Sequence, residues 1–419
     1  MGVVYGEIMK ITVVGLGYVG LPLAVAFAEV GYEVIGVDAN PKRIDELRGG
    51  YDRTGEISKE RLSSVDIKFT TNISDASGSD FFIIAVPTPV DEHHVPDLSL
   101  VTKASESVGK AISKGAIVIL ESTVYPGVTE EIVGPTIEKV SGLRAGIDFK
   151  LAYSPERVNP GDKVHTLKTI TKVVSGQDEE TLNKVADLYS KIVDKVFKAE
   201  SIKVAEASKV VENTQRDVNI ALMNEFAIAF DRMGISIWDV LDAASTKWNF
   251  LKFTPGLVGG HCIPVDPYYL IYRARSYGFH PQIMSSARRV SDSMVDCLLL
   301  KIMGALNEFG KPVKDSNILF LGITFKENVP DMRNSLNFKL AEKLISMGAN
   351  VTLVDPHADV KDVHREIPSG RWDVVVLAVP HNEFRHKIDM ISELDTPIFV
   401  DIKGILRHKK GKFRVYITM

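Results

Sequence analysis

The segment "VVGLGYVG", residues 13–20, constrains the fold of this chain more than any other feature of its sequence. Its three glycines, Gly15, Gly17 and Gly20, lie between an apolar strand-like run and a helical pattern. In a strand–turn–helix unit, the first glycine permits the tight turn and the second lets the backbone approach a pyrophosphate. The third lets the helix pack close to the strand. The pattern therefore predicts a dinucleotide-binding βαβ unit near the start of the chain.

An acidic residue follows this unit at the expected distance. The second predicted strand ends at Asp38, 18 residues after Gly20. A carboxylate there accepts hydrogen bonds from the adenosine ribose hydroxyls and repels a 2′-phosphate, which favours NAD over NADP. Arg43 qualifies this preference, because an arginine can also bind a phosphate. The other residues expected to line the cofactor site are Tyr18, Val19, Thr88 and Thr123.

Short apolar runs alternate with helical segments in the first third of the chain. The expected strands are residues 11–15, 32–38, 81–87 and 116–122, and a helix is expected near 20–30. This alternation is typical of a parallel sheet with helices on both faces.

The pattern changes near residue 200. About 30 residues without proline or internal glycine predict one long helix up to Gly234. Further helices are expected at 236–244, 282–309 and 335–347, and strands return with "NILFLG", "NVTLVDP", "DVVVLAVP" and "PIFVDI".

The C-terminal part of the chain resembles the N-terminal part in places, since "VTLVDPH" is similar to "VIGVDAN". We therefore expect an α/β fold of two Rossmann-like, doubly wound domains joined by a long central helix and a helical middle. The expected domains are a dinucleotide-binding domain at 1–199, a helical part at 200–310 and a second Rossmann-like domain at 311–419. The tail has "GITFKEN" where the head has "GLGYVG", so the second domain should not bind a dinucleotide in the same way.

The composition describes an ordinary globular protein, with 45% hydrophobic and 25% charged residues. A net charge of −4 argues against nucleic acid or an acidic membrane as the main partner. No apolar run is long enough for a transmembrane helix, and because "MGVVYGEIMK" has no basic segment before an apolar core, we do not expect it to be a secretory signal. Two cysteines form neither a disulfide framework nor a zinc pattern, so no metal and a cytoplasmic location are expected.

One of the two cysteines, Cys262, lies in the unusual stretch "GLVGGHCIPVDP", residues 256–267. Pro264 and Pro267 disfavour a regular helix or a central strand, so we expect an ordered loop. By contrast, Cys297 lies in an apolar helical pattern that is typical of core.

The neighbours of Cys262 favour a reactive thiol over an inert one. Gly259 and Gly260 keep the approach narrow and free of side chains, while His261 and Asp266 can tune or position a thiolate. The alternative is ordinary packing, because unpaired cysteines are among the most buried residues.

The long helix supplies a second group of candidates. Lys209, Asn213 and Arg216 are spaced i, i+4 and i+7, so they lie on one face. Their spacing is equally compatible with a solvated stripe and with a face turned into a cleft, although asparagine is a poor choice in an exposed helix interior.

Taken together, these motifs resemble the nucleotide-sugar 6-dehydrogenases, the UDP-glucose and UDP-N-acetylhexosamine dehydrogenase group. The resemblance covers essentially the whole chain. Its most specific segments are "ESTVYPG", "SPERVNPG", "EASKVVENTQRDVNIALMNE", "GLVGGHCIPVDP" and "FKENVPDMRNS".

This resemblance implies an NAD-dependent, four-electron oxidation of a sugar C6 alcohol to a carboxylate. Cys262 would capture the aldehyde as a thiohemiacetal, and oxidation of that adduct would give a thioester that water hydrolyses. Lys209 would act in acid/base work or stabilise oxyanion charge, and Asn213 would help hold the reacting oxygen. Asp266 would orient or activate water with Lys209.

The resemblance also assigns residues around the reacting centre and the substrate. Thr123 and Glu156 match residues that position water and transfer protons. Lys326 and Arg333 match residues that reach the UDP pyrophosphate and the sugar, and an arginine fork suits a diphosphate. The remaining expected substrate contacts are Arg216, Phe253 and Gly259.

One departure concerns the hydrolytic base. The UDP-glucose enzymes carry a second glutamate shortly after the first, where this chain has Pro160. The base is therefore not assigned to Glu156 alone.

The motif variants "GGHC" and "NTQRDVN" resemble the branch that acts on UDP-N-acetylglucosamine or its galacto epimer, with UDP-N-acetylmannosamine as the close alternative. The resemblance also implies a homodimer or a dimer of dimers formed through residues 200–310, NAD bound by residues 1–199 and the UDP-sugar bound by residues 311–419. Other readings are a UDP-glucose 6-dehydrogenase, a two-electron hydroxyacid-type dehydrogenase without a thioester, a non-catalytic sensor and a structural scaffold.

Overall fold

A computed structural model describes residues 9–158, 164 and 166–419. The chain divides into two compact units. The first holds the chain up to Glu212 together with Tyr268–Phe279, and the second holds Asn213–Pro267 together with His280–Met419. Pro160 and the residues before Met9 lie outside the described residues.

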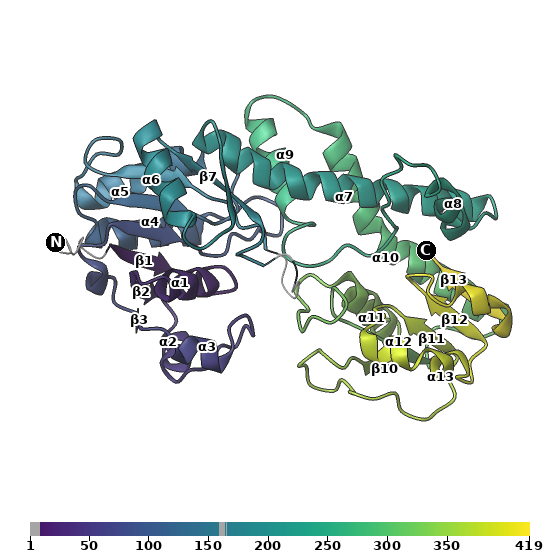
Figure 1. The fold of residues 1–419 in the computed structure, drawn as a ribbon. Coiled ribbons are helices and arrows are strands. Elements are labelled where there is room, and N and C mark those ends of the chain that lie inside the picture. Colours follow the sequence, from purple (N-terminus) through teal and green to yellow (C-terminus); the bar gives the residue numbers. More distant parts are fainter. Residues whose placement is uncertain (1–8, 159–163, 165) are drawn as a thin grey trace. The chain divides into compact units, whose positions relative to one another are not determined.

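The first unit is built on an eight-stranded sheet in the order β3-β2-β1-β4-β5-β6-β7-β8 (Figure 1). Neighbouring strands are parallel except β6 and β7, which pair in the antiparallel direction. The strands are β1 (Lys10–Val14), β2 (Glu33–Val37), β3 (Ile67–Thr70), β4 (Phe81–Ile84), β5 (Ile117–Leu120), β6 (Lys150–Tyr153), β7 (Thr171–Gly176) and β8 (Lys195–Lys198).

The second unit contains a five-stranded, fully parallel sheet in the order β10-β9-β11-β12-β13. Its strands are β9 (Asn317–Leu321), β10 (Asn350–Val354), β11 (Val374–Leu377), β12 (Ile398–Asp401) and β13 (Val415–Thr418). In each sheet the chain order reverses beside the first strand, between β1 and β4 and between β9 and β11. Ligands of open α/β sheets bind at such switch points.

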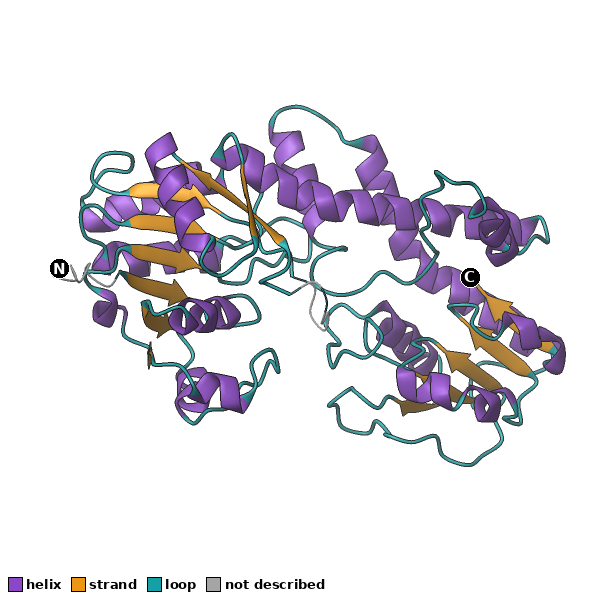
Figure 2. Ribbon diagram, in the orientation of Figure 1, coloured by secondary structure: helices purple, strands orange, loops and turns teal. Residues whose placement is uncertain are grey.

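Helices lie against the strands of both sheets (Figure 2). Those of the first sheet domain are α1 (Gly20–Glu29), α2 (Pro41–Arg48), α3 (Lys59–Ser63), α4 (Ser99–Ala111), α5 (Gly134–Ser141) and α6 (Glu179–Tyr189), with the turns η1 (Ile73–Ala76) and η2 (Thr129–Val133). The helices that lie between the two sheets in the sequence are α7 (Ile202–Arg232), α8 (Ile237–Ala244), α9 (Asp266–Ser276) and α10 (Gln282–Glu308). The last domain contains α11 (Leu336–Ser346), α12 (Asn382–His386), α13 (Ile388–Ser392) and η3 (Arg407–Lys412).

The central strands are apolar because both faces of each sheet are covered. All residues of β4 and β5 are buried in the first unit, as are all residues of β11 and β12 in the second. Such runs are typical of doubly wound parallel sheets rather than of half-exposed strands. The predicted fold class is confirmed, and the division into three domains stays a prediction.

The long helix is also present, since α7 spans 31 residues. The expected loop at residues 256–267 is wrong in its C-terminal boundary. The stretch 256–267 is a loop only up to Val265, because α9 begins at Asp266. Pro267 does not prevent this, since proline is tolerated in the first helical turn, where its missing N–H has no intrahelical partner.

In the described part of the chain, no helix combines the length and the hydropathy that crossing a membrane requires.

Candidate functional site

The glycine loop after β1 has the geometry that a dinucleotide needs. Gly15 has a φ of +93°, and a Cβ there would lie 2.6 Å from the Ala85 carbonyl oxygen. A Cβ on Gly20 would lie 1.8 Å from the Gly15 oxygen, so helix and strand are packed too closely for any side chain. A Cβ on Gly17 would meet no atom within 4 Å. The open side of the loop is therefore at Gly17, where the backbone can approach a pyrophosphate.

The N-terminus of α1 carries the partial positive charge that favours phosphate binding. Val19 is the N-cap residue and gives the helix no side-chain cap. The amide groups of the first turn are consequently available to phosphate oxygens, which they bind with the help of the helix dipole. Tyr18 lies beside them with 39% of its surface exposed. These residues fit NAD.

Asp38 and Arg43 serve this loop in different ways. The Asp38 carboxylate is half-buried and accepts hydrogen bonds from the amides of Leu16 (2.9 Å) and Asn40 (2.9 Å). Arg43 is only 4% exposed and donates to the Leu16 carbonyl and to Asp52, both at 2.8 Å. Because Asp52 neutralises Arg43, this arginine supports the loop and adds little net positive charge for a 2′-phosphate.

The loop that carries Thr123 leaves the carboxyl end of β5 and is fastened on two sides. Ser122 accepts from the Val86 amide (3.0 Å) and donates to the Val86 carbonyl (2.7 Å), which joins it to the loop after β4. In that neighbouring loop, the carbonyl of buried Thr88 accepts from Tyr269 at 2.6 Å. Thr123 itself is half-buried between these contacts.

Glu206 of α7 holds the other end of the Thr123 loop. Its buried carboxylate accepts from the amides of Gly127 (2.5 Å) and Thr129 (2.9 Å) and from the Thr129 hydroxyl (2.7 Å). Burial raises the pKa of Glu206 to about 7, although these donors oppose the shift. The sequence analysis missed this residue, one helical turn before Lys209.

Glu156 lies in the loop after β6. One carboxylate oxygen accepts from the Arg157 amide at 2.7 Å and also from the Val158 amide. Arg157 then reaches Glu212 of α7 at 2.9 Å and the Thr171 carbonyl at 2.8 Å. The Glu156 loop is therefore attached to the same helix segment that carries Lys209.

The three residues predicted to share one face of α7 become more exposed along the helix. Lys209 is 8% exposed, Asn213 is half-buried and Arg216 is exposed. Within the described residues, the Lys209 ammonium makes neither a hydrogen bond nor an ion pair. A buried cation of this kind is poised to bind an anionic ligand or a developing oxyanion.

Cys262 lies in a turn that exposes its side chain. Its carbonyl accepts from the amides of Val265 (3.1 Å) and Asp266 (2.8 Å), which closes the turn just before α9. Asp266 is buried, and its carboxylate accepts from the Asn213 amide group at 2.6 Å. The structure thus brings Asn213 and Asp266 into contact beside the cysteine turn.

The cysteine loop is also tied to the loop that follows β9. The Gly260 amide donates to the Arg333 carbonyl (3.2 Å), and Asn334 donates to the Gly260 carbonyl (3.1 Å). Gly260 has a φ of +90°, and a Cβ there would press against the Phe325 ring at 2.8 Å. A Cβ on Gly259 would lie 2.7 Å from the Asn334 carbonyl oxygen.

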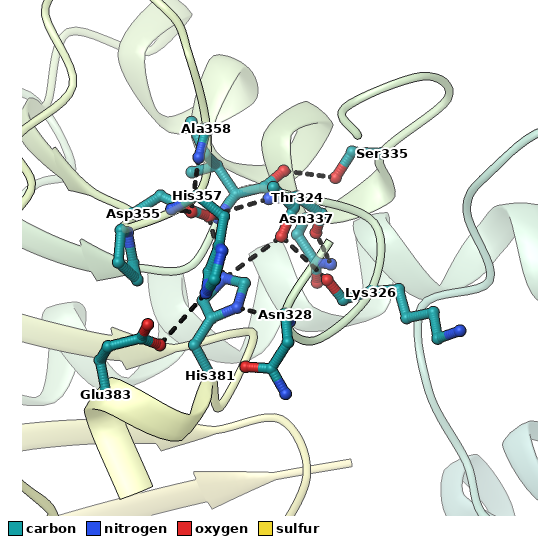
Figure 3. Close-up of polar contacts among 12 residues, drawn as sticks. Thr324, Lys326, Asn328, Ser335, Asn337, Asp355, His357, Ala358, His381 and Glu383 are labelled. Atoms are coloured by element: carbon teal, nitrogen blue, oxygen red, sulfur yellow. Dashed lines mark hydrogen bonds and ion pairs between the residues drawn. The ribbon is translucent and has the colours of Figure 1, made fainter. Parts of the chain in front are cut away.

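The predicted diphosphate residues come from this second loop, residues 322–335. The Arg333 guanidinium binds Asp331 through two nitrogens, at 3.0 and 2.6 Å. Burial lowers the pKa of His261, and the Arg333 charge lowers it further, so neutral imidazole is favoured beside Cys262. The Lys326 side chain points away from a cluster of polar residues around Asp355 and His381 (Figure 3). Phe253 is half-buried against the core of the second unit.

That polar cluster shows how the second sheet domain departs from the first. Asp355, which follows β10, accepts from the backbone amides of four residues at 2.7–3.1 Å: Ile323, Thr324, His357 and Ala358 (Figure 3). Burial raises the pKa of Asp355, but the His381 hydrogen bond and these amides outweigh it and hold the pKa well below its usual range.

His381 completes the cluster across the switch point of this sheet. The Asn328 amide donates to Nδ1 at 2.9 Å, so Nε2 carries the proton and donates to Asp355 at 3.1 Å. Asp355 follows its strand as Asp38 does, and both accept from the loop after the first strand of their sheet. However, Asp355 is fully buried. It organises the loop and cannot bind a ribose.

This contrast predicts different effects for two matched substitutions. Asp355→Asn places an amide group against backbone N–H donors, and we expect it to destabilise the protein by about 2–3 kcal/mol with unchanged NAD affinity. Asp38→Asn faces two such donors at a half-buried site, so it should cost less stability, about 1 kcal/mol, and weaken NAD binding by about 10-fold. Thermal unfolding and NAD titration of both variants measure this, and equal melting shifts would contradict it.

A glycine loop, an uncapped helix start and a carboxylate after the second strand give the first unit the features of a dinucleotide-binding domain. Models of three domains of the UDP-glucose/GDP-mannose dehydrogenase family match this chain: the NAD binding domain at 9–193, the central domain at 203–293 and the UDP binding domain at 319–408. The chain belongs to this family. It is an NAD-binding oxidoreductase with a UDP-sugar substrate.

Individual relatives cover nearly the whole chain. Protein CapL of Staphylococcus aureus is 52% identical over 95% of this chain and 96% of its own length. A UDP-N-acetyl-D-glucosamine 6-dehydrogenase of Pseudomonas aeruginosa is 47% identical, covering 97% and 99%. The structure of a UDP-D-ManNAc dehydrogenase from Pyrococcus horikoshii superposes with a TM-score of 0.89 at 33% identity, covering 98% and 99%.

The sequence analysis missed further residues around the cysteine loop. Buried Asn224 of α7 binds both the amide (2.8 Å) and the carbonyl (3.1 Å) of Gly256, where the loop begins. A Cβ on Gly256 would lie 2.6 Å from the Lys403 ammonium, whose pKa burial lowers. Asparagine inside a helix was an available signal for Asn224. Nothing in the local pattern marked Lys403.

Proposed function

We propose that this enzyme oxidises the C6 hydroxyl of a UDP-N-acetylhexosamine to the carboxylate, through a thioester on Cys262. The observation that carries the proposal is the cysteine loop itself. It exposes a thiol and is hydrogen-bonded, through Gly260, to the same loop that presents Arg333. An alcohol can become an aldehyde without a thiol, whereas oxidation from aldehyde to acid benefits from covalent capture.

In the first stage, a base takes the C6 hydroxyl proton while the two electrons and the hydrogen on carbon leave as hydride. Bound NAD supplies the hydride acceptor in each of the two oxidations. The buried ammonium of Lys209 would stabilise negative charge on the reacting oxygen, and Asn213 would hold that oxygen in place.

In the second stage, the Cys262 thiolate adds to the aldehyde carbon and forms a C–S bond. Loss of a second hydride from this thiohemiacetal leaves a thioester. Water then attacks the acyl carbon, the C–S bond breaks, and carboxylate and thiolate are released. Thr123 and Glu156 would position and deprotonate this water, while Asp266 would orient groups beside the thiol. The hydrolytic base is not assigned to Glu156 alone.

The names of relatives support the N-acetylated substrate. The Pseudomonas relative is a UDP-N-acetyl-D-glucosamine 6-dehydrogenase at 47% identity, and a Pyrococcus horikoshii relative at 35% is a UDP-N-acetyl-D-mannosamine dehydrogenase. We therefore favour UDP-N-acetylglucosamine over the manno epimer, with UDP-glucose as the second alternative.

The test is the number of NADH formed per sugar nucleotide consumed, with UDP-GlcNAc, UDP-ManNAc and UDP-glucose in parallel. We expect two NADH per UDP-GlcNAc and much slower turnover of the other two. Two NADH from UDP-ManNAc alone would move the assignment to that epimer. One NADH per sugar would remove the thioester and leave a two-electron dehydrogenase.

A further inference from the structure

A buried charged pair lies behind the loops of Thr123 and Glu156, and none of the roles proposed above uses it. Glu121 directly follows β5, and Lys172 lies within β7. Neither side chain has any exposed surface, and the Lys172 ammonium lies 2.6 Å from a Glu121 carboxylate oxygen. Burial raises the pKa of Glu121, against the opposing charge of Lys172.

The same ammonium makes a second contact, with the backbone of the neighbouring loop. It donates to the Pro155 carbonyl at 3.0 Å, and Pro155 immediately precedes Glu156. Glu121 in turn stands two residues before Thr123. Since β5 and β6 are adjacent parallel strands, their loops leave the same edge of the sheet. One ammonium therefore links the two loops where they begin.

Stability alone does not explain this pair. A buried ion pair costs a large desolvation free energy, and apolar residues of similar volume often stabilise a fold equally well or better. Part of the local structure is also secured without it, because Ser154 donates to the Val173 carbonyl at 2.7 Å and so fixes the end of β6 to β7. The distinctive effect of Lys172 is the link to Pro155.

We propose that Glu121 and Lys172 are positioning residues for hydrolysis of the thioester, because they fix the separation of Thr123 and Glu156. This proposal rests on the proposed function, in which those two residues handle the attacking water. A displacement of about 1 Å can cost on the order of 100-fold in rate. Lys209, Asn213 and Cys262 lie on other elements, so formation of the thioester should depend less on this pair than its hydrolysis does.

Two variants remove the link. Lys172→Met abolishes it but leaves Glu121 buried without a cation, which endangers folding. The double variant Glu121→Met, Lys172→Met removes both charges and preserves volume. With UDP-GlcNAc and NAD, we expect it to form the thioester at nearly the wild-type rate and hydrolyse it about 10–100-fold more slowly. Mass spectrometry should then find sugar acyl groups accumulating on Cys262, after a burst of NADH.

Tyr189→Phe is the matched control. The Tyr189 hydroxyl donates to the same Glu121 carboxylate, whereas the hydrogen bond to the Pro155 carbonyl comes from Lys172. Loss of the Tyr189 hydroxyl should leave hydrolysis at the wild-type rate. If neither charge-removing variant folds, Glu121→Gln decides, because it keeps the side-chain shape and removes the anion that holds Lys172. We expect slower hydrolysis in that variant as well.

The outcomes separate the two proposals. A folded double variant, or a folded Glu121→Gln, that hydrolyses the thioester at the wild-type rate overturns the positioning role. Equal slowing of thioester formation and hydrolysis also overturns it, since that result indicates general support of the fold. The proposed function fails in a different way, if wild-type enzyme forms one NADH per sugar and never carries an acyl group on Cys262.

Discussion

Replacing Cys262 with serine is expected to lower the rate of complete UDP-sugar oxidation by at least about 1,000-fold, because removing an enzymatic nucleophile has effects of this size or larger. A serine hydroxyl is not ionised near neutral pH and is a much weaker nucleophile than a thiolate. The side chain is exposed in a turn, so the substitution should leave folding and NAD affinity unchanged. Rapid-mixing measurements of NADH and of the covalent adduct test both statements.

Cys297→Ser is the matched control for this prediction. Cys297 is half-buried on α10, inside the helical pattern where the sequence placed it. We expect this variant to form two NADH per sugar at the wild-type rate. If Cys262→Ser also formed two NADH per sugar at the wild-type rate, the thioester mechanism would be wrong and the oxidation would proceed without covalent capture.

Much of the fold could be predicted because its strongest signals are local. The glycine loop, the apolar central strands and the long helix can each be recognised from one continuous stretch of sequence. The strands β3, β6, β7 and β8 of the first sheet were not anticipated, and neither was β13 of the second sheet. β8, "KVFK", has no fully buried residue, and β7 carries Lys172 in its interior. Neither strand therefore shows the apolar run by which the central strands were found.

The candidate site was predictable only in part, for a related reason. Motifs indicated which loops carry chemistry, but the contacts that shape these loops join residues far apart in the chain. Asn224 reaches Gly256 over 32 positions, Lys172 reaches Glu121 over 51 and Asn334 reaches Gly260 over 74. Such pairs are set by sheet order and helix packing, which no local window contains.

The internal repeat adds a further lesson. "VIGVDAN" and "VTLVDPH" look alike, and Asp38 and Asp355 do follow equivalent strands. Their surroundings decide their roles, since two amides bind the Asp38 carboxylate whereas four amides and a histidine bind that of Asp355. Similar strands thus support a dinucleotide loop in one domain and a longer loop with Lys326 and Arg333 in the other.

Lys209→Met is expected to separate activity from stability. We expect it to lower the rate of NADH formation by about 100–1,000-fold, because it removes a charge that would stabilise oxyanions in the reaction. The same change should raise the free energy of unfolding by about 1 kcal/mol, since a buried ammonium without a partner among the described residues is replaced by an apolar chain of similar length. Denaturant unfolding and initial rates measure the two effects.

Lys203→Met provides the comparison on the same helix. The Lys203 side chain is 53% exposed, and its ammonium lies 3.6 Å from a Glu131 carboxylate oxygen. Its charge is therefore stabilised by both solvent and an ion pair. Its loss should change stability by less than about 0.5 kcal/mol and leave the rate unaltered. If Lys209→Met destabilised the protein as well as inactivating it, the lysine would be a structural residue, and its isolation in the helix interior would need another explanation. Increased stability with lost activity is the result that a catalytic lysine requires.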